Sequence, residues 1–284
     1  MFSAVLPWVL RAVWAALPFV AGPGLAALLD DWSEPVRTTA SVALWAEWTV
    51  VLVATLVPHP VCLTILRMAA PAGATASVAV AVEGHGTGAL LHWLLVLALA
   101  FAPETGRWFV NGSAYPNERR FPLRPPGPLL LGPILVAWVL AIGVPAAGAL
   151  MLAAGRWVAG ALVLAAGLGL AVVLGRALHT LSRRWLVFVP AGLVVHDELA
   201  LADPVLLRRQ TIRSFGPAPA GTDALDLTQR ALGLALRIET SEDVPLVLTT
   251  PGNRAGRPAS ASALLVTPTR PGAVLAEARA RRIG

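Results

Sequence analysis

One acidic and two basic side chains fall inside long apolar stretches of this sequence. Arg11, Glu47 and Arg67 lie in the first, second and third stretches, respectively. An ionisable side chain near the middle of a bilayer costs at least about 2.5 kcal/mol, so such a residue needs a partner or a function. Counting 1.5 Å per helical residue places the three at similar depths, and we predict that they form one intramembrane polar cluster.

Two kinds of chemistry fit this cluster. The interpretation we favour is a structural ion pair between Glu47 and one of the arginines, with the arginine side chains reaching toward the surface. The alternative is a proton- or ion-handling site at the polar centre of a transporter. The structural interpretation predicts that Glu47→Gln lowers the thermal stability of the detergent-purified protein, and unchanged melting would count against it.

Other reactive residues lack the partners that catalysis or metal binding requires. His85 and His92 share a helical face beside Glu83, but no third or fourth ligand follows at a suitable spacing. His59 and Cys62 are close in sequence, and nothing orients or activates the thiol. We therefore predict no catalytic residue, no metal, no cofactor and, with a single cysteine, no intramolecular disulfide.

The composition is that of a membrane protein. Of 284 residues, 56% are hydrophobic and 13% are charged, whereas about a quarter of a soluble protein is charged. All 22 basic residues are arginine, which is typical of a GC-rich bacterial genome. Residues 185–284 carry 11 arginines and 9 acidic residues, and this near balance argues against nucleic-acid binding.

The apolar stretches define the elements that must position the cluster. A spanning helix needs about 20 mostly apolar residues. Because the first charge, Arg11, lies inside its stretch, a cleaved signal peptide is not expected. Four helices, with Val61–Ala102 as a re-entrant or interfacial pair, are the alternative to six. The six predicted spans are Ala4–Leu29, Val36–Val57, Val61–Val82, Thr87–Ala102, Leu129–Ala154 and Gly155–Leu181.

Arginine-rich connections predict the orientation. Short loops rich in arginine stay in the cytoplasm, and the Pro103–Pro128 connection is one of them. This places both termini in the cytoplasm and the protein in the inner (plasma) membrane. We expect the loop arginines mainly to set topology; binding anionic lipid and docking the tail are the alternatives. These residues are Arg107, Arg119, Arg120 and Arg124.

Tryptophans and small residues give two further patterns. Several tryptophans lie too deep to belong to the interfacial aromatic belts: Trp14, Trp45, Trp48, Trp93 and Trp138. The sixth span has two series of small residues spaced by four, which allow close helix contact, within the chain or in a homo-oligomer. The series are Ala161, Ala165, Gly169 and Gly167, Ala171, Gly175.

The last third of the chain changes its period from helical to β-type. Leu232, Leu234, Leu236 and Ile238 alternate along one strand and should bury one face. The sequence also predicts loops at Pro217–Thr222 and Pro251–Ser262, and a closing helix at Pro271–Arg282. The predicted strands are Trp185–Val189, Leu193–His196, Val205–Arg209, Thr211–Phe215, Ala231–Thr240, Pro245–Thr250 and Ala263–Thr267.

Two stretches resemble bacterial pleckstrin-homology-like domains that are attached to membrane helices. Residues 184–195 are similar to the opening hairpin of those domains, and residues 264–275 resemble their last strand, Pro-containing turn and closing helix. The resemblance implies a small β-rich domain without enzymatic activity. In phosphoinositide-binding members of the wider family the first hairpin loop is basic. Here it is the uncharged Pro190-Ala191-Gly192, so headgroup binding is not expected there.

The sequence therefore predicts a helical membrane bundle, residues 1–184, followed by a cytoplasmic β-rich domain, residues 185–284. The first functional hypothesis is a non-enzymatic membrane anchor or scaffold whose residues 185–284 bind a protein partner. The alternative is a transporter or channel subunit that uses Glu47, Arg11 and Arg67. A water-filled cavity that reaches Glu47 favours the alternative, whereas a dry bundle favours the scaffold, and an intramembrane enzyme ranks last.

Overall fold

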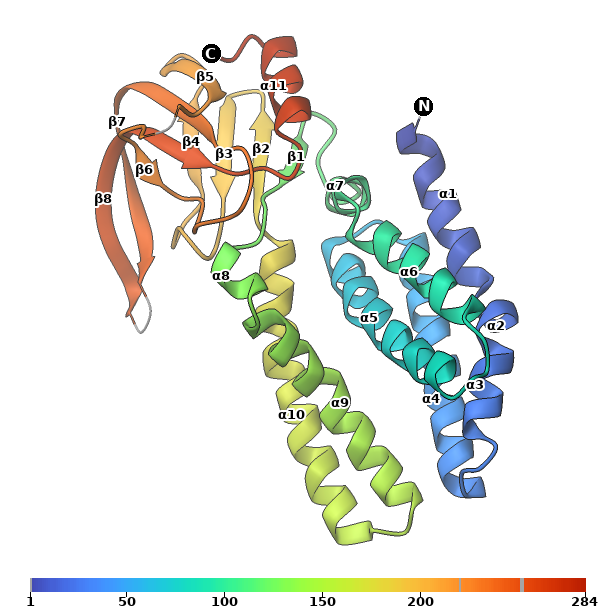
Figure 1. Cartoon of the computed structure of the whole chain (residues 1–284). Coiled ribbons are helices and arrows are strands. Elements are labelled where there is room, and N and C mark those ends of the chain that lie inside the picture. Colours follow the sequence, from blue (N-terminus) through green and yellow to red (C-terminus); the bar gives the residue numbers. More distant parts are fainter. Residues whose placement is uncertain (1, 220, 251–252) are drawn as a thin grey trace. The chain divides into compact units, whose positions relative to one another are not determined.

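The chain divides into two compact units that interleave along the sequence. The sequence predicted a single boundary at Trp185. In the structure, residues Ser113–Ile134 also belong to the C-terminal unit, because they add a strand to its first sheet. The computed structural model describes residues 2–219, 221–250 and 253–284. A helical unit comprises Met1–Gly112 and Leu135–His179, and a β unit comprises Ser113–Ile134 and Thr180–Gly284 (Figure 1).

Prolines divide the first span of the helical unit into three short helices. They are α1 (Phe2–Ala15), α2 (Leu17–Val20) and α3 (Gly22–Leu29). Pro18 and Pro23 occupy the first turns of α2 and α3, where a missing N–H costs nothing. These helices together form one candidate span, Val5–Leu29.

The next spans are continuous until α6. Among the described residues, five candidate spans are long and apolar enough to cross a membrane, and six if a bent pair is one span. Because α5 (Pro60–Val82) is itself long and apolar enough to cross a membrane, the structure favours the predicted third span over a re-entrant segment at this place. The helices are α4 (Glu34–Leu56), α5 (Pro60–Val82), α6 (Gly88–Phe101), α7 (Pro103–Asn111), α8 (Gly127–Leu130), α9 (Pro133–Ala153) and α10 (Trp157–Ser182).

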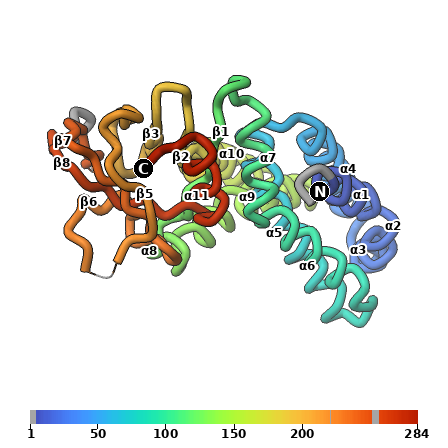
Figure 2. The backbone as a smooth tube through the Cα atoms, turned by 90° about the horizontal axis from the view of Figure 1, so that it is seen from above, coloured from blue at the N-terminus to red at the C-terminus, as the bar shows by residue number. Residues whose placement is uncertain are grey.

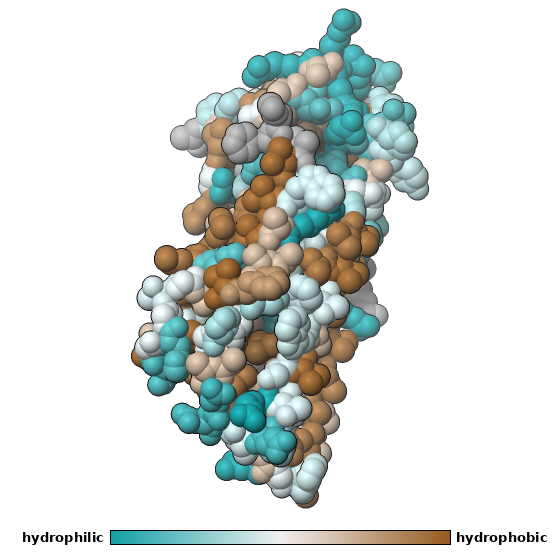
Figure 3. Space-filling view, turned by 90° about the vertical axis from the view of Figure 1, so that its right-hand side faces the viewer, coloured by the Kyte–Doolittle hydropathy of each residue, from teal (hydrophilic) through white to brown (hydrophobic). Residues whose placement is uncertain are grey.

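The bend between α6 and α7 explains why the fourth span is the least regular. The 14 residues of α6 span about 21 Å at 1.5 Å per residue, short of a hydrocarbon core of about 30 Å. Pro103 lacks the N–H that would continue the helix, and α7 leaves at 52°. The helical unit exposes many large apolar side chains, such as Val42, Leu91 and Val158, and Figure 3 shows hydrophobic side chains in brown on one face of the molecule.

Glycines bring α9 and α10 into close contact. A Cβ added to Gly148, Gly160 or Gly167 would approach backbone atoms of the facing helix to within 2.4–2.7 Å. Gly167 lies against Pro145 of α9, so this glycine serves packing within the chain. The homo-oligomer through Gly167, Ala171 and Gly175 stays a prediction. The other small-residue series, which ends at Gly169, is exposed.

The β unit contains two four-stranded sheets, the short helix α8 and the C-terminal helix α11. The first sheet has the order β1-β2-β3-β4 and is antiparallel throughout. The second has the order β5-β7-β8-β6 and pairs only β6 in parallel. Beside β5 lies α11 (Pro271–Ala280), which buries Val274 and Ala278 (Figure 2). The strands are β1 (Arg119–Pro122), β2 (Trp185–Val189), β3 (Gly192–His196), β4 (Val205–Arg208), β5 (Ile212–Pro217), β6 (Leu225–Asp226), β7 (Leu236–Thr250) and β8 (Asn253–Val266).

The second sheet differs from its prediction in two ways. The strands predicted at 231–240 and 245–250 are one strand, β7, with a register shift between Glu239 and Val244. Most of the predicted loop 251–262 is part of β8, because this segment pairs with β7 in a hairpin. Residues 251–252 lie outside the described part of the chain. Leu236 and Ile238 are fully buried as predicted, whereas Leu232 and Leu234 precede β7 and are exposed.

Candidate functional site

Glu47 lies in the middle of α4 and does not form the predicted ion pair. Its Oε1 atom is buried and has no hydrogen-bond partner among the described residues. No salt bridge joins it to Arg11 or Arg67 in that part of the chain, because both guanidinium groups are directed to other partners. The predicted ion pair of Glu47 is therefore absent among the described residues, and none of them supplies a compensating cation to Glu47.

Arg11 is held by a carbonyl and two aromatic rings. Its Nε donates to Thr55 O at 3.1 Å. Its guanidinium carbon lies 4.7 Å from the ring centroid of Trp8 and 5.4 Å from that of Trp108. The electron-rich faces of indole rings stabilise a cation, so this arginine does not need a carboxylate nearby.

Arg67 satisfies the backbone at the bend after α6. The last carbonyls of a helix have no partner within it, and Pro103 prevents the helix from continuing. Arg67 Nε donates to Ala100 O at 3.2 Å, and Thr105 Oγ1 donates to Leu99 O at 2.7 Å. The guanidinium group also lies over the ring of Phe101. This arginine therefore has a structural role at a broken helix.

Glu47 instead lines a cavity of about 430 Å³ within the helical unit. The cavity is bounded by α1, α2, α3, α4, α5 and α6, and four tryptophans contribute to its wall. Apart from Glu47 and Ser41, its described lining consists of apolar, glycine and tryptophan side chains. The lining residues are Trp14, Leu17, Pro18, Ala21, Gly22, Pro23, Leu25, Ala26, Leu29, Ser41, Leu44, Trp45, Glu47, Trp48, Gly73 and Trp93.

The tryptophans of this wall hold each other in fixed positions. Trp14 Nε1 donates to Trp48 O, and Trp48 Nε1 donates to Trp14 O, each at 3.0 Å. The rings of Trp14 and Trp93 are edge to face with centroids 5.5 Å apart, as are those of Trp45 and Trp48. These two indole N–H bonds join α1 to α4, and they fix the orientation of the Trp14 and Trp48 rings.

Gly73 of α5 and Trp93 of α6 line the cavity together. A Cβ on Gly73 would overlap the indole of Trp93, so only glycine admits the ring there. Trp93 Nε1 is buried and has no acceptor among the described residues. Two residues of the cavity lining thus each carry a buried polar atom without a partner among the described residues, the Glu47 oxygen and this N–H. Buried polar groups without partners are rare in proteins and indicate a missing ligand or a functional role.

The sequence pointed to Glu47 but missed the tryptophans as its neighbours. They were recognised only as too deep for an interfacial belt. Trp45 and Trp48 flank Glu47 at helical spacing, and this local signal could have linked them to it. Trp14 and Trp93 come from distant spans, and only the packing of α1 and α6 brings them to the cavity.

The loop arginines are divided between the two units. Arg107 lies in α7 of the helical unit, whereas Arg119 and Arg120 lie in β1, opposite Phe188 and Val187 of β2. Arg120 also pairs with Glu118 at 3.1 Å. The connection therefore contributes one edge strand, β1, to the β unit.

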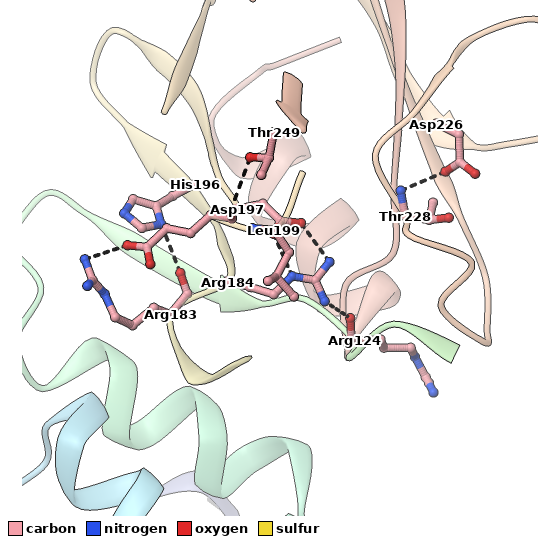
Figure 4. A network of polar contacts seen from close by, with 10 residues as sticks. Arg124, Arg183, Arg184, His196, Asp197, Leu199, Asp226, Thr228 and Thr249 are labelled. Atoms are coloured by element: carbon pink, nitrogen blue, oxygen red, sulfur yellow. Dashed lines mark hydrogen bonds and ion pairs between the residues drawn. The ribbon is translucent and has the colours of Figure 1, made fainter. Parts of the chain in front are cut away.

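Arg124 takes part in a buried network at the root of the β unit (Figure 4). Its carbonyl accepts from Arg184 Nη1 at 2.7 Å. Arg184 also forms a two-point ion pair with Asp197, at 2.7 Å for both contacts, and both side chains are almost fully buried. Asp197 accepts in addition from Leu199 N. The network joins the end of α10, the incoming connection and β3 within one unit.

A second hollow of about 340 Å³ lies at the β2–β3 turn. Although the turn itself is uncharged, Arg209 and Arg282 line the hollow together with Arg281. Arg281 is already bonded to Glu277 at 2.7 Å and to Asn117 O at 3.1 Å. Sequence reasoning missed this basic surface because its arginines come from the end of β4 and from the segment after α11.

Two of the remaining predicted residues, His92 and His59, serve as hydrogen-bond partners of the backbone. His92 Nε2 contacts Val13 O at 2.8 Å, and His59 Nδ1 accepts from Val61 N. In the described part of the chain, no group of three or more His, Cys, Asp or Glu side chains could hold a metal ion. No family model, no curated protein and no solved structure matches this sequence.

Proposed function

We propose that this chain is an integral membrane protein whose helical unit binds a lipophilic small molecule within the bilayer, as a transporter or membrane-embedded binding protein does. The observation that supports the proposal is the tryptophan-lined cavity that reaches Glu47. Its volume of about 430 Å³ falls in the range of small-molecule sites, roughly 300–1,000 Å³, which are mostly apolar with a few polar groups. We therefore favour a ligand-binding membrane protein over the scaffold.

The exposed side of the cavity favours entry from the membrane. Trp45 is 57% exposed although it lines the cavity. In a bilayer this surface of α4 faces hydrocarbon or another apolar group. A ligand dissolved in the membrane could therefore reach the cavity without crossing water, and an apolar ligand would lose little hydration on binding.

The pairing of β1 with β2 supports the orientation that we propose. These strands come from the connection before α9 and from the segment after α10, and their hydrogen bonds require both segments on one side of the membrane. α9 and α10 therefore supply two crossings. The arginine content of the Pro103–Pro128 connection places this side, and with it the β unit, in the cytoplasm.

A cavity-filling substitution tests ligand binding. A Cβ on Gly22, which lines the cavity, would have no heavy atom within 4 Å, so Gly22→Leu should occupy space without displacing the backbone. Brominated alkylbenzenes quench tryptophan emission on contact, and we expect saturable quenching in the purified wild-type protein that Gly22→Leu removes. Gly169→Leu is the matched control, because Gly169 of α10 also has open space around it. Equal quenching of all three proteins would refute a specific cavity site.

A second function, partner binding by the β unit, remains a proposal with its own support. We infer a pleckstrin-homology-like domain from the two sheets and closing helix, together with the resemblance of residues 184–195 and 264–275. Leu232 is 68% exposed and Leu234 is 48% exposed on this unit. Affinity isolation of the full protein in mild detergent should recover a protein partner that Leu232→Ser with Leu234→Ser loses; identical recoveries from both would contradict this surface.

A further inference from the structure

Because Glu47 brings the one carboxylate of the described cavity lining, the cavity selects ligands by charge. We propose that its ligand is a lipophilic organic cation, with an ammonium-type group beside the Glu47 carboxylate and an apolar body against the indole rings. The inference rests on the proposed function, since it requires that the cavity bind a small molecule. It adds the chemical class of that molecule.

The first argument is the missing countercharge. An ionised carboxylate in an apolar environment is costly unless a cation is near, and truncating the cation of a buried pair is strongly unfavourable. Arg11 and Arg67 are bonded to carbonyls and aromatic faces elsewhere. No basic residue belongs to the described lining of the cavity. A cationic ligand would supply the charge that the chain itself does not provide.

The second argument is the aromatic wall. Trp presents the strongest cation-binding face of the natural side chains, and the attraction is greater where water is excluded. Trp14 and Trp48 use their N–H groups on each other's backbone carbonyls, so they are not donors to a ligand. Arg11, lying between two indoles in the same unit, shows that such rings accept a cation here.

The third argument excludes the opposite charge. An anion in this cavity would meet the Glu47 carboxylate with no arginine in the described lining to compensate. Trp93 Nε1 is the buried N–H without an acceptor at this site, and one neutral donor does not offset that repulsion. A neutral apolar ligand would fit the walls but would leave the Glu47 oxygen unsatisfied.

Matched probes that differ only in charge test the inference on the full-length protein in nanodiscs. Alkyltrimethylammonium ions carrying a phenyl group are compared with isosteres in which a quaternary carbon replaces nitrogen, over several chain lengths. Binding is measured by calorimetry and by tryptophan quenching. We expect the wild-type protein to bind the cations at least tenfold more tightly than the isosteres. We expect Glu47→Gln to lower cation affinity at least tenfold and to change isostere affinity less than twofold.

The outcomes separate the inference from the function on which it rests. Saturable binding of both probe types with equal affinity would overturn cation selectivity and leave the cavity as a neutral lipophilic site. Absence of saturable binding of either type would overturn both proposals. If Glu47→Gln is not recovered folded, the wild-type comparison still decides the matter. Trp45→Leu then provides the second variant, and it should weaken cation binding more than isostere binding.

Discussion

The buried pair of Arg184 and Asp197 provides the sharpest test of how the β unit is held together. Asp197→Ala removes both 2.7 Å contacts to Arg184 and the acceptor of Leu199 N. Arg184 is 1% exposed, so its charge would be left buried without compensation. Removing one partner of a buried pair costs about 3–5 kcal/mol, and we expect that loss in the stability of the β unit.

Adjacent residues supply a control in the same loop. Glu198→Ala breaks the ion pair of Arg183 with Glu198, whose contact is 2.8 Å but whose side chains are 44% and 37% exposed. Exposed pairs contribute roughly 0–1 kcal/mol, because water screens them. Replacing both buried partners, as in Arg184→Met with Asp197→Leu, should recover much of the stability, since no unpaired charge remains.

Hydrogen exchange of the full-length protein in detergent measures this difference. In the regime where exchange reports local opening, about 3–5 kcal/mol corresponds to roughly two to four orders of magnitude in rate for the amides of β2 and β3. Glu198→Ala should change these rates less than about tenfold. An Asp197→Ala protein whose exchange rises less than tenfold would refute the reasoning that an uncompensated arginine is left in the core.

Three further predictions follow from the packing. Gly167→Leu should lower the thermal midpoint in detergent, since its Cβ would lie 2.6 Å from Pro145 N and overpacking costs about 1–3 kcal/mol; Gly169→Leu should not. Phe121→Ala should destabilise the β unit by about 3–5 kcal/mol, because Phe121 is 5% exposed and packs on Phe188. Limited proteolysis at residues 113–134 measures this loss, and unchanged cleavage would contradict it. Glu47→Gln should leave thermal stability unchanged or raise it, because no ion pair is lost; a lowered midpoint would restore the structural interpretation.

The apolar pattern was enough to predict the membrane spans and the change to a β-rich tail. Length and composition fix whether a segment can reside in hydrocarbon, and alternation fixes which strand face is buried, as at Leu236 and Ile238. The pattern misassigned the segment 251–262 because its Ala, Ser and Pro content resembles a loop. Its strand geometry depends on pairing with β7, which is not visible locally.

The candidate site was predictable only in part. The sequence identified Glu47 as costly, because an ionisable residue in a long apolar run is a local fact. It assigned the wrong partners because similar depth does not imply proximity: rotation about the helix axes decides which side chains meet. Packing sends Arg67 to the bend after α6 and Arg11 to Thr55 and two indoles, so neither reaches Glu47.

The sequence by itself determined where the chain can leave water, because transfer into hydrocarbon depends on composition and length alone. It also determined that one carboxylate would lie at depth. Only the tertiary structure decided that Glu47 lines a cavity together with four tryptophans and no arginine among its described lining residues. It likewise decided that the connection before α9 is a strand of the β unit. Both outcomes depend on contacts between residues far apart in the chain, where packing and hydrogen bonding act on the folded surfaces.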